Sequence, residues 1–151
     1  DGFLDDASWH GAEPMGRWSQ GAVGRLDLVP LEPAECDLEL GLVVGAGAGA
    51  GLTQGPRRIS LRVNGTPMAS VLVVTGRDVP LGGVLRKADL GDETKLRIEI
   101  EIDRCFRPSD LSGSDDDREL GVFVRSATLR AASVAAGPMF MNWLRSVNQS
   151  G

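Results

Sequence analysis

The stretch Lys95–Asp103 alternates without exception between apolar and charged side chains. Successive side chains of a β-strand point to opposite faces of the sheet, so this period of two predicts a strand with one face in a core and the other in water. The apolar face would hold Leu96, Ile98, Ile100 and Ile102, opposite Arg97, Glu99, Glu101 and Asp103. The stretch therefore restricts the chain to folds built from half-buried strands.

Three other segments carry the same alternation: Ala22–Leu28, Cys36–Val44 and Arg58–Val63. Asn64-Gly65, the strongest short signal for a β-hairpin, follows the last of them, and the β-branched run Ala69–Thr75 can return beside it. Alternation repeated in this way, with turn residues between the runs, predicts an all-β fold, either an antiparallel sandwich or a barrel.

The longest strand-like run lies in Ser114–Arg130. Its apolar residues occupy one parity and then the other: Leu120, Val122 and Val124, followed by Ala127 and Leu129. A change of parity within one strand indicates a bend or a β-bulge midway. Asp117 and Arg118 lie just before this strand, and we expect the N-terminal segment to hold this charged pair.

The C-terminal segment has a different pattern. Pro138 is followed by an apolar stripe with helical spacing: Met139, Phe140, Trp143, Leu144 and Val147. This pattern predicts a short amphipathic helix. We therefore divide the chain into a β-sandwich domain, residues 1–132 with a tryptophan-bearing arm at 1–20, and a helix and tail at 133–151. The helix can cover an end of the sandwich, lead to another domain, or form a dimer contact.

Composition excludes several function classes. A chain of 151 residues corresponds to one domain, and its net charge of −5 argues against a nucleic-acid or anionic-membrane partner. No apolar run is long enough to span a bilayer. The start Asp1-Gly2-Phe3, without Met, indicates a piece of a larger protein. We expect Cys36 and Cys105 to be reduced core residues, and a single histidine leaves a conventional zinc site without ligands.

Two loops resemble ligand-binding motifs. Gly45, Gly47 and Ala50 match a dinucleotide fingerprint, but another strand follows before a helix could hold the pyrophosphate, so we interpret this stretch as an inter-strand loop. The acidic stretch at 110–117 could hold Ca²⁺ through Asp110, Asp115 and Asp116, although it does not fit the EF-hand pattern. The alternative is an acidic turn whose carboxylates accept backbone hydrogen bonds. We predict no cofactor.

The candidate site combines the arm with the mouth of the last long strand. Its residues are Trp9, His10, Glu13, Arg17, Trp18, Asp117 and Arg118. Aromatic faces beside planar hydrogen-bonding groups suit a saccharide. The alternative is structural: Glu13 or Asp117 pairs with Arg17 or Arg118, while the tryptophans close one end of the sandwich. Glu13 and Asp117 could also form a glycosidase carboxylate pair, whereas His10 has no Ser or Cys partner in a catalytic motif.

An ordered set of motifs carries a family resemblance. It comprises Trp9, Glu13, Arg17 and Trp18, then Val63-Asn64-Gly65, Pro108, Asp116, Arg118, Leu120 and Gly121. In this order they resemble a β-sandwich module appended to bacterial glycosyltransferases and other cell-surface polysaccharide biosynthesis proteins. The resemblance implies a non-catalytic, jelly-roll-like accessory domain that binds glycans. The loop at Gly45–Gly51 and the tail after Ala131 depart from the module's pattern.

Three functional hypotheses follow. The first is a carbohydrate-binding accessory domain of a cytoplasmic polysaccharide-biosynthesis protein, whose partners are a saccharide and the other domains of that protein. The second is an interaction or oligomerisation module that acts through the C-terminal helix. The third is a glycan hydrolase that uses Glu13 and an Asp of the acidic loop.

Overall fold

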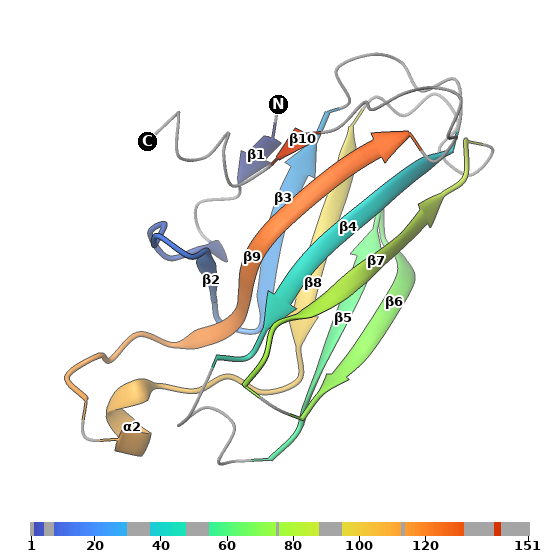
Figure 1. The fold of residues 1–151 in the computed structure, drawn as a ribbon. Coiled ribbons are helices and arrows are strands. Elements are labelled where there is room, and N and C mark those ends of the chain that lie inside the picture. Colours follow the sequence, from blue (N-terminus) through green and yellow to red (C-terminus); the bar gives the residue numbers. More distant parts are fainter. Residues whose placement is uncertain are drawn as a thin grey trace.

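The computed structural model describes residues 2–4, 8–29, 37–47, 55–74, 76–87, 95–112, 114–131 and 141–142. These residues form two antiparallel sheets that pack face to face. Figure 1 shows one layer, with β9, β4 and β7, in front of the other, with β3, β8, β5 and β6. The all-β sandwich expected from the alternating segments is confirmed.

The first sheet, called here the β8 sheet, has the strand order β1-β3-β8-β5-β6. In that order the strands span Gly2–Leu4, Val23–Leu28, Leu96–Ile102, Arg57–Val63 and Thr66–Val73. The second, called the β9 sheet, has the order β10-β9-β4-β7, and β2 also pairs with β9. Its strands span Met141–Asn142, Leu120–Ala131, Leu38–Gly45 and Val79–Leu85, with β2 at Arg17–Gln20. A short helix, α2, spans Pro108–Ser112.

The path of the chain through the two sheets is that of a jelly roll. From β2 to β9, each strand lies in the opposite sheet to the one before it, except that β5 and β6 form a hairpin within the β8 sheet. The first and last strands of this series, β2 and β9, pair with each other, and so do the second and the second to last, β3 and β8. This nesting is the arrangement of a jelly roll. The acidic loop, α2 and the start of β9 therefore lie at the end of the molecule away from β1 and β10 (Figure 1).

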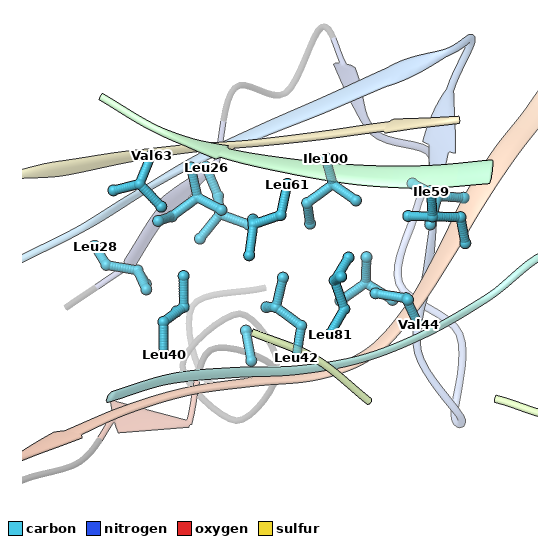
Figure 2. Packing of buried hydrophobic residues seen from close by; sticks show 14 of the residues in the cluster. Leu26, Leu28, Leu40, Leu42, Val44, Ile59, Leu61, Val63, Leu81 and Ile100 are labelled. Atoms are coloured by element: carbon cyan, nitrogen blue, oxygen red, sulfur yellow. The ribbon is translucent and has the colours of Figure 1, made fainter. Parts of the chain in front are cut away.

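The core lies between the sheets, where the inward residues of the alternating segments meet. Figure 2 shows side chains from β3 and β5 facing those from β4 and β7 across it. The inward residues of β8, predicted from the sequence, are at most 1% exposed: Leu96, Ile98, Ile100 and Ile102. Burial of this apolar surface is the main force that holds the two sheets together.

The hairpin predicted at Asn64-Gly65 is present and joins β5 to β6. Asn64 and Gly65 have φ angles of 51° and 82°, the left-handed region that a two-residue turn with the strand twist requires. The return strand begins at Thr66, directly after the turn, and so starts earlier than the Ala69–Thr75 run that we predicted.

The change of parity in the last long strand is a β-bulge at Arg125. Val43 pairs with Ser126 and Val44 pairs with Val124, so Arg125 is the extra residue. Its guanidinium Nε lies 2.7 Å from Oδ2 of Asp78. The bulge therefore lets β9 bury Val124 on one side of it and Ala127 on the other while Arg125 stays exposed.

The C-terminal helix is not found in the part of that segment that the structure describes. Met141 and Asn142 form β10 and pair with Leu129 and Thr128 of β9. The helical prediction is therefore wrong for these two residues, because a strand there satisfies backbone groups on the edge of β9. The rest of the predicted stripe, Met139, Phe140, Trp143, Leu144 and Val147, lies outside the described residues.

Cys105 is a free, half-buried thiol that packs against the core, as expected. Burial and the neighbouring Glu119 carboxylate raise the pKa of this thiol. Cys36 and the loop at 48–54 lie outside the described residues. Across the described ranges, we find no helix with the length and apolar character needed to cross a membrane.

Candidate functional site

The tryptophan-bearing arm folds back on itself and pairs with the start of β9. Glu13 and Gly16 close a tight hairpin, in which the Glu13 N–H donates to the Gly16 carbonyl at 2.9 Å. Beyond it, Arg17 pairs with Val124 and Trp18 pairs with Phe123 of β9. The arm therefore lies against the mouth of the last long strand, where we expected it, and its residues Arg17–Gln20 form the strand β2.

Trp9 and Trp18 have different environments. Trp9 bridges to Ser19 and is 3% exposed, and its Nε1–H donates to the Arg25 carbonyl at 2.7 Å. Its ring lies over Gly24, where an added Cβ would approach Cζ2 of the indole to 2.6 Å. No face of this ring is open for a sugar to stack on, so Trp9 closes the sandwich, as in the structural alternative, and we leave it out of the candidate site.

Trp18 is half-buried at the surface, between two phenylalanines. Its ring centroid lies 5.6 Å from that of Phe106, edge to face, and 5.0 Å from that of Phe123 at a tilt of 57°. Both arrangements are favourable for aromatic pairs. The two phenylalanines therefore fix the orientation of the ring while part of it stays open to solvent.

Arg118 is held between two carboxylates. Its Nε and Nη2 donate to Oδ1 and Oδ2 of Asp116 at 2.9 and 2.8 Å, and its Nη1 lies 3.8 Å from Oε2 of Glu13. The side chain of Arg118 is 39% exposed and that of Glu13 is 41% exposed. The hydrogen bonds that Arg118 donates to the Asp116 carboxylate raise the pKa of Arg118. The arm and the acidic loop therefore meet in a fixed, solvent-accessible ion cluster.

We expected Asp117 to belong to this cluster, but it does not. Its Oδ1 accepts a hydrogen bond from Ser109 Oγ at 2.6 Å, and its carbonyl accepts one from Arg107. These bonds tie Asp117 to Ser109 of α2 and to Arg107 just before it. Asp116, and not Asp117, is the aspartate that pairs with Arg118. Its Oδ1 also accepts a hydrogen bond from the backbone N–H of Arg118, which closes a turn that the spacing D-x-R favours.

His10 joins the arm to the residue after Arg118, and Arg17 braces His10. The His10 backbone N–H donates to the Trp18 carbonyl at 3.0 Å, and its Nε2–H donates to the Glu119 carbonyl at 2.8 Å. Arg17 Nε in turn donates to the His10 carbonyl. The structure thus brings together His10, Glu13, Arg17, Trp18 and Arg118 from the predicted set and adds Asp116.

The calcium alternative gains no support from this loop. Within the ranges described above, no three His, Cys, Asp or Glu side chains come together in a way that could hold a metal ion. Both side-chain oxygens of Asp116 instead accept hydrogen bonds from Arg118. This arrangement corresponds to the acidic turn that was the other interpretation of the stretch.

Asp116 should make stability depend on pH in a defined range. Hydrogen bonds from the Arg118 side chain and backbone lower the pKa of Asp116 from 3.8 to about 2. Because the native pKa lies below the ordinary value, the contribution is complete above pH 3.8 and disappears as the pH falls towards 2. We expect Asp116→Asn to lower the melting temperature at pH 7 and to match the wild type near pH 2, measured by thermal unfolding across that range. An equal difference at both ends of the range would contradict this assignment.

Of the comparisons with known proteins, only the one with solved structures found similar proteins. No family model matches the sequence, and a search of curated proteins found no match. Among solved structures, the chain is similar to the C-terminal domain of EclA, a sugar-binding protein, with 10% identity and a TM-score of 0.48 over 86% of this chain and 77% of that one. It is also similar to a family 35 carbohydrate-binding module from Clostridium thermocellum, with 11% identity and a TM-score of 0.48 over 87% of this chain and 93% of that one. A third is the PA14 sugar-binding domain from an RTX adhesin, with 12% identity and a TM-score of 0.37 over 81% of this chain and 51% of that one.

Proposed function

We propose that this domain binds carbohydrate without cleaving it, on the surface formed by Trp18, His10, Glu13, Asp116 and Arg118, with Arg17 holding the arm in place. This surface is called the arm site below. One observation carries the proposal: a 39% exposed guanidinium is fixed between two carboxylates at the start of β9, the strand with which the partly exposed Trp18 pairs. Neighbouring sugar hydroxyls need closely spaced donors and acceptors, and the C–H face of a sugar packs on an aromatic ring.

The arm site is organised before any ligand arrives. Asp116 holds two nitrogens of Arg118, and Phe106 and Phe123 hold Trp18. Side chains that are already ordered lose little conformational entropy on binding. This helps to bind a sugar, a strongly hydrated ligand that gains little free energy from each contact. This order supports a binding role for residues that would otherwise be solvated surface groups.

The proposal predicts that Arg118→Gln weakens glycan binding by about tenfold or more, since hydrogen bonds to a charged group contribute about 1.5–3 kcal/mol. Titration calorimetry with a panel of surface-polysaccharide fragments would measure the change. Arg25→Gln is the matched control, because Arg25 lies 3.1 Å from Glu99 in the β8 sheet with a similar exposure of 45%. We expect this control to bind like the wild type. No binding by any fragment at millimolar concentration, or equal losses in both variants, would refute the arm site.

We further propose that the domain is an accessory part of a cytoplasmic, glycosyltransferase-type protein of polysaccharide biosynthesis. This finer statement rests on the motif resemblance from Trp9 to Gly121, in which Asp116 and Arg118 form the D-x-R element. A glycosyltransferase domain on the same full-length chain would support the assignment, and a chain with only extracellular hydrolase domains would contradict it.

Docking or oligomerisation is the second candidate. It is favoured by the apolar stripe at 139–147 and by three exposed apolar side chains on or beside β6 and β7, namely Leu72, Val74 and Val84, which are 48%, 62% and 53% exposed. Truncation after Ala132 separates the two roles. A change in oligomeric state with unchanged glycan binding would favour docking through the tail, and loss of folding would assign the tail to the sandwich.

A further inference from the structure

We infer that the arm site selects glycans without carboxylate or sulfate groups, an inference that rests on the proposed carbohydrate binding. Surface arginines are the usual means by which a protein holds an acidic sugar, because the planar guanidinium pairs with two anionic oxygens at once. The question is therefore whether the arginine of this site is available for such a pair.

Arg118 already forms this pair within the protein. The Nε and Nη2 edge that would hold an anion donates to both oxygens of Asp116, at 2.9 and 2.8 Å. The remaining nitrogen, Nη1, faces Glu13 at 3.8 Å. An acidic sugar would have to displace Asp116 and leave that carboxylate without its counter-ion, beside the incoming negative charge. The Asp116 carboxylate, called here the built-in occupant, thus already fills the position on Arg118 that the anion of an acidic sugar would take.

The charges around Arg118 also disfavour the binding of an anionic sugar. One guanidinium between two carboxylates leaves the cluster negative, and the whole chain has a net charge of −5. Arg107, before the acidic loop, and Arg17, in the arm, also have partners: Arg107 lies 3.4 Å from Glu119, and Arg17 donates its Nε to the His10 carbonyl. An anionic ligand therefore meets net repulsion, which is strongest at low ionic strength.

An uncharged sugar meets no such penalty. Oε2 of Glu13 lies 3.8 Å from Nη1 of Arg118, which is beyond hydrogen-bond distance, so Oε2 can accept a hydrogen bond from a ligand hydroxyl. Nη1 of Arg118 can donate to a ring or hydroxyl oxygen of the same ligand. Both groups gain hydrogen bonds without breaking the Arg118–Asp116 pair. The same geometry that excludes an anion therefore accepts a neutral polyol.

The test uses matched oligosaccharide pairs that differ only in oxidation at C6: galactose with galacturonate, mannose with mannuronate, and glucose with glucuronate oligomers. Calorimetry at pH 8 and low salt would compare the wild type with Asp116→Asn, which removes the charge of the built-in occupant. We expect the neutral member of at least one pair to bind about tenfold more tightly than its uronate in the wild type. In Asp116→Asn we expect uronate affinity to rise about tenfold and to fall again with added salt.

Asp27→Asn is the control, because Asp27 pairs with Arg97 at 3.4 Å in the β8 sheet and should leave both affinities unchanged. Circular dichroism would confirm that each variant is folded. Tighter binding of the uronates by the wild type would overturn this inference and leave carbohydrate binding intact. No binding by either member of any pair would overturn the inference together with the proposed function. If Asp116→Asn had the same selectivity as the wild type, Asp116 would not be the residue that excludes acidic sugars.

Discussion

Replacing Trp9 by Ala is expected to lower the free energy of unfolding by about 3–5 kcal/mol, the range for removing a large buried aromatic side chain. The ring of Trp9 is 3% exposed, packs over Gly24, and donates to the Arg25 carbonyl. The variant would leave a cavity under the arm and the part-buried Arg25 carbonyl without its side-chain donor. Since a domain has only about 5–15 kcal/mol of net stability, this loss is a large part of the total.

Urea unfolding followed by circular dichroism would measure the effect. Trp9→Phe keeps most of the ring volume but loses the hydrogen bond, so we expect an intermediate loss and a variant that still folds. Trp18→Ala serves as a comparison: because Trp18 is only half-buried, we expect this variant to lose less free energy of unfolding than Trp9→Ala. A loss below about 1 kcal/mol for Trp9→Ala would show that Trp9 does not close the sandwich.

Gly121→Ala is expected to destabilise the protein by about 3 kcal/mol, at the upper end of the usual cost of overpacking. Gly121 is the second residue of β9, in the part of that strand that pairs with β2. An added Cβ would collide with the Gly21 carbonyl oxygen and with Oγ of Ser19. Ser19 cannot move away cheaply, because its hydroxyl is fully buried, accepts the Val122 N–H and donates to the Gly21 carbonyl, each at 2.9 Å.

Gly11→Ala is the matched control for this variant. Gly11 lies in the same arm, but an added Cβ there would have no atom within 4 Å. We expect its free energy of unfolding to stay within about 0.5 kcal/mol of the wild type. If Gly121→Ala were equally harmless, β2 could not pack against β9 as closely as the structure shows.

Period-two patterns predicted the strands that have one face in the core and one in water. They did not predict β7, where Pro80, Gly82 and Gly83 interrupt the alternation. Proline is tolerated there because β7 is at the edge of its sheet. They did, however, predict the bulge in β9, since Val124 and Ala127 must both be buried and only an extra residue between them allows it.

The sequence predicted which segments form the proposed arm site but not the role of each residue in it. Trp9 and Trp18 are equally apolar in the sequence, and only the pairing of Trp9 with Ser19 shows that Trp9 faces inward. Likewise, Asp116 and Asp117 are adjacent identical residues, and which of them meets Arg118 depends on the turn between Asp116 and the Arg118 N–H. Such choices depend on backbone geometry that composition and periodicity do not carry.

The most direct test of the account is to map a bound glycan by backbone amide chemical shifts in the full chain. We predict that a neutral oligosaccharide that binds will shift amides of His10–Trp18 and Asp116–Glu119 and leave the charged face around Arg25, Arg97 and Glu99 unchanged. Shifts concentrated on that face, or along the bulged strand around Arg125 and Arg130, would show that the arm site is a structural ion cluster and that the ligand binds elsewhere.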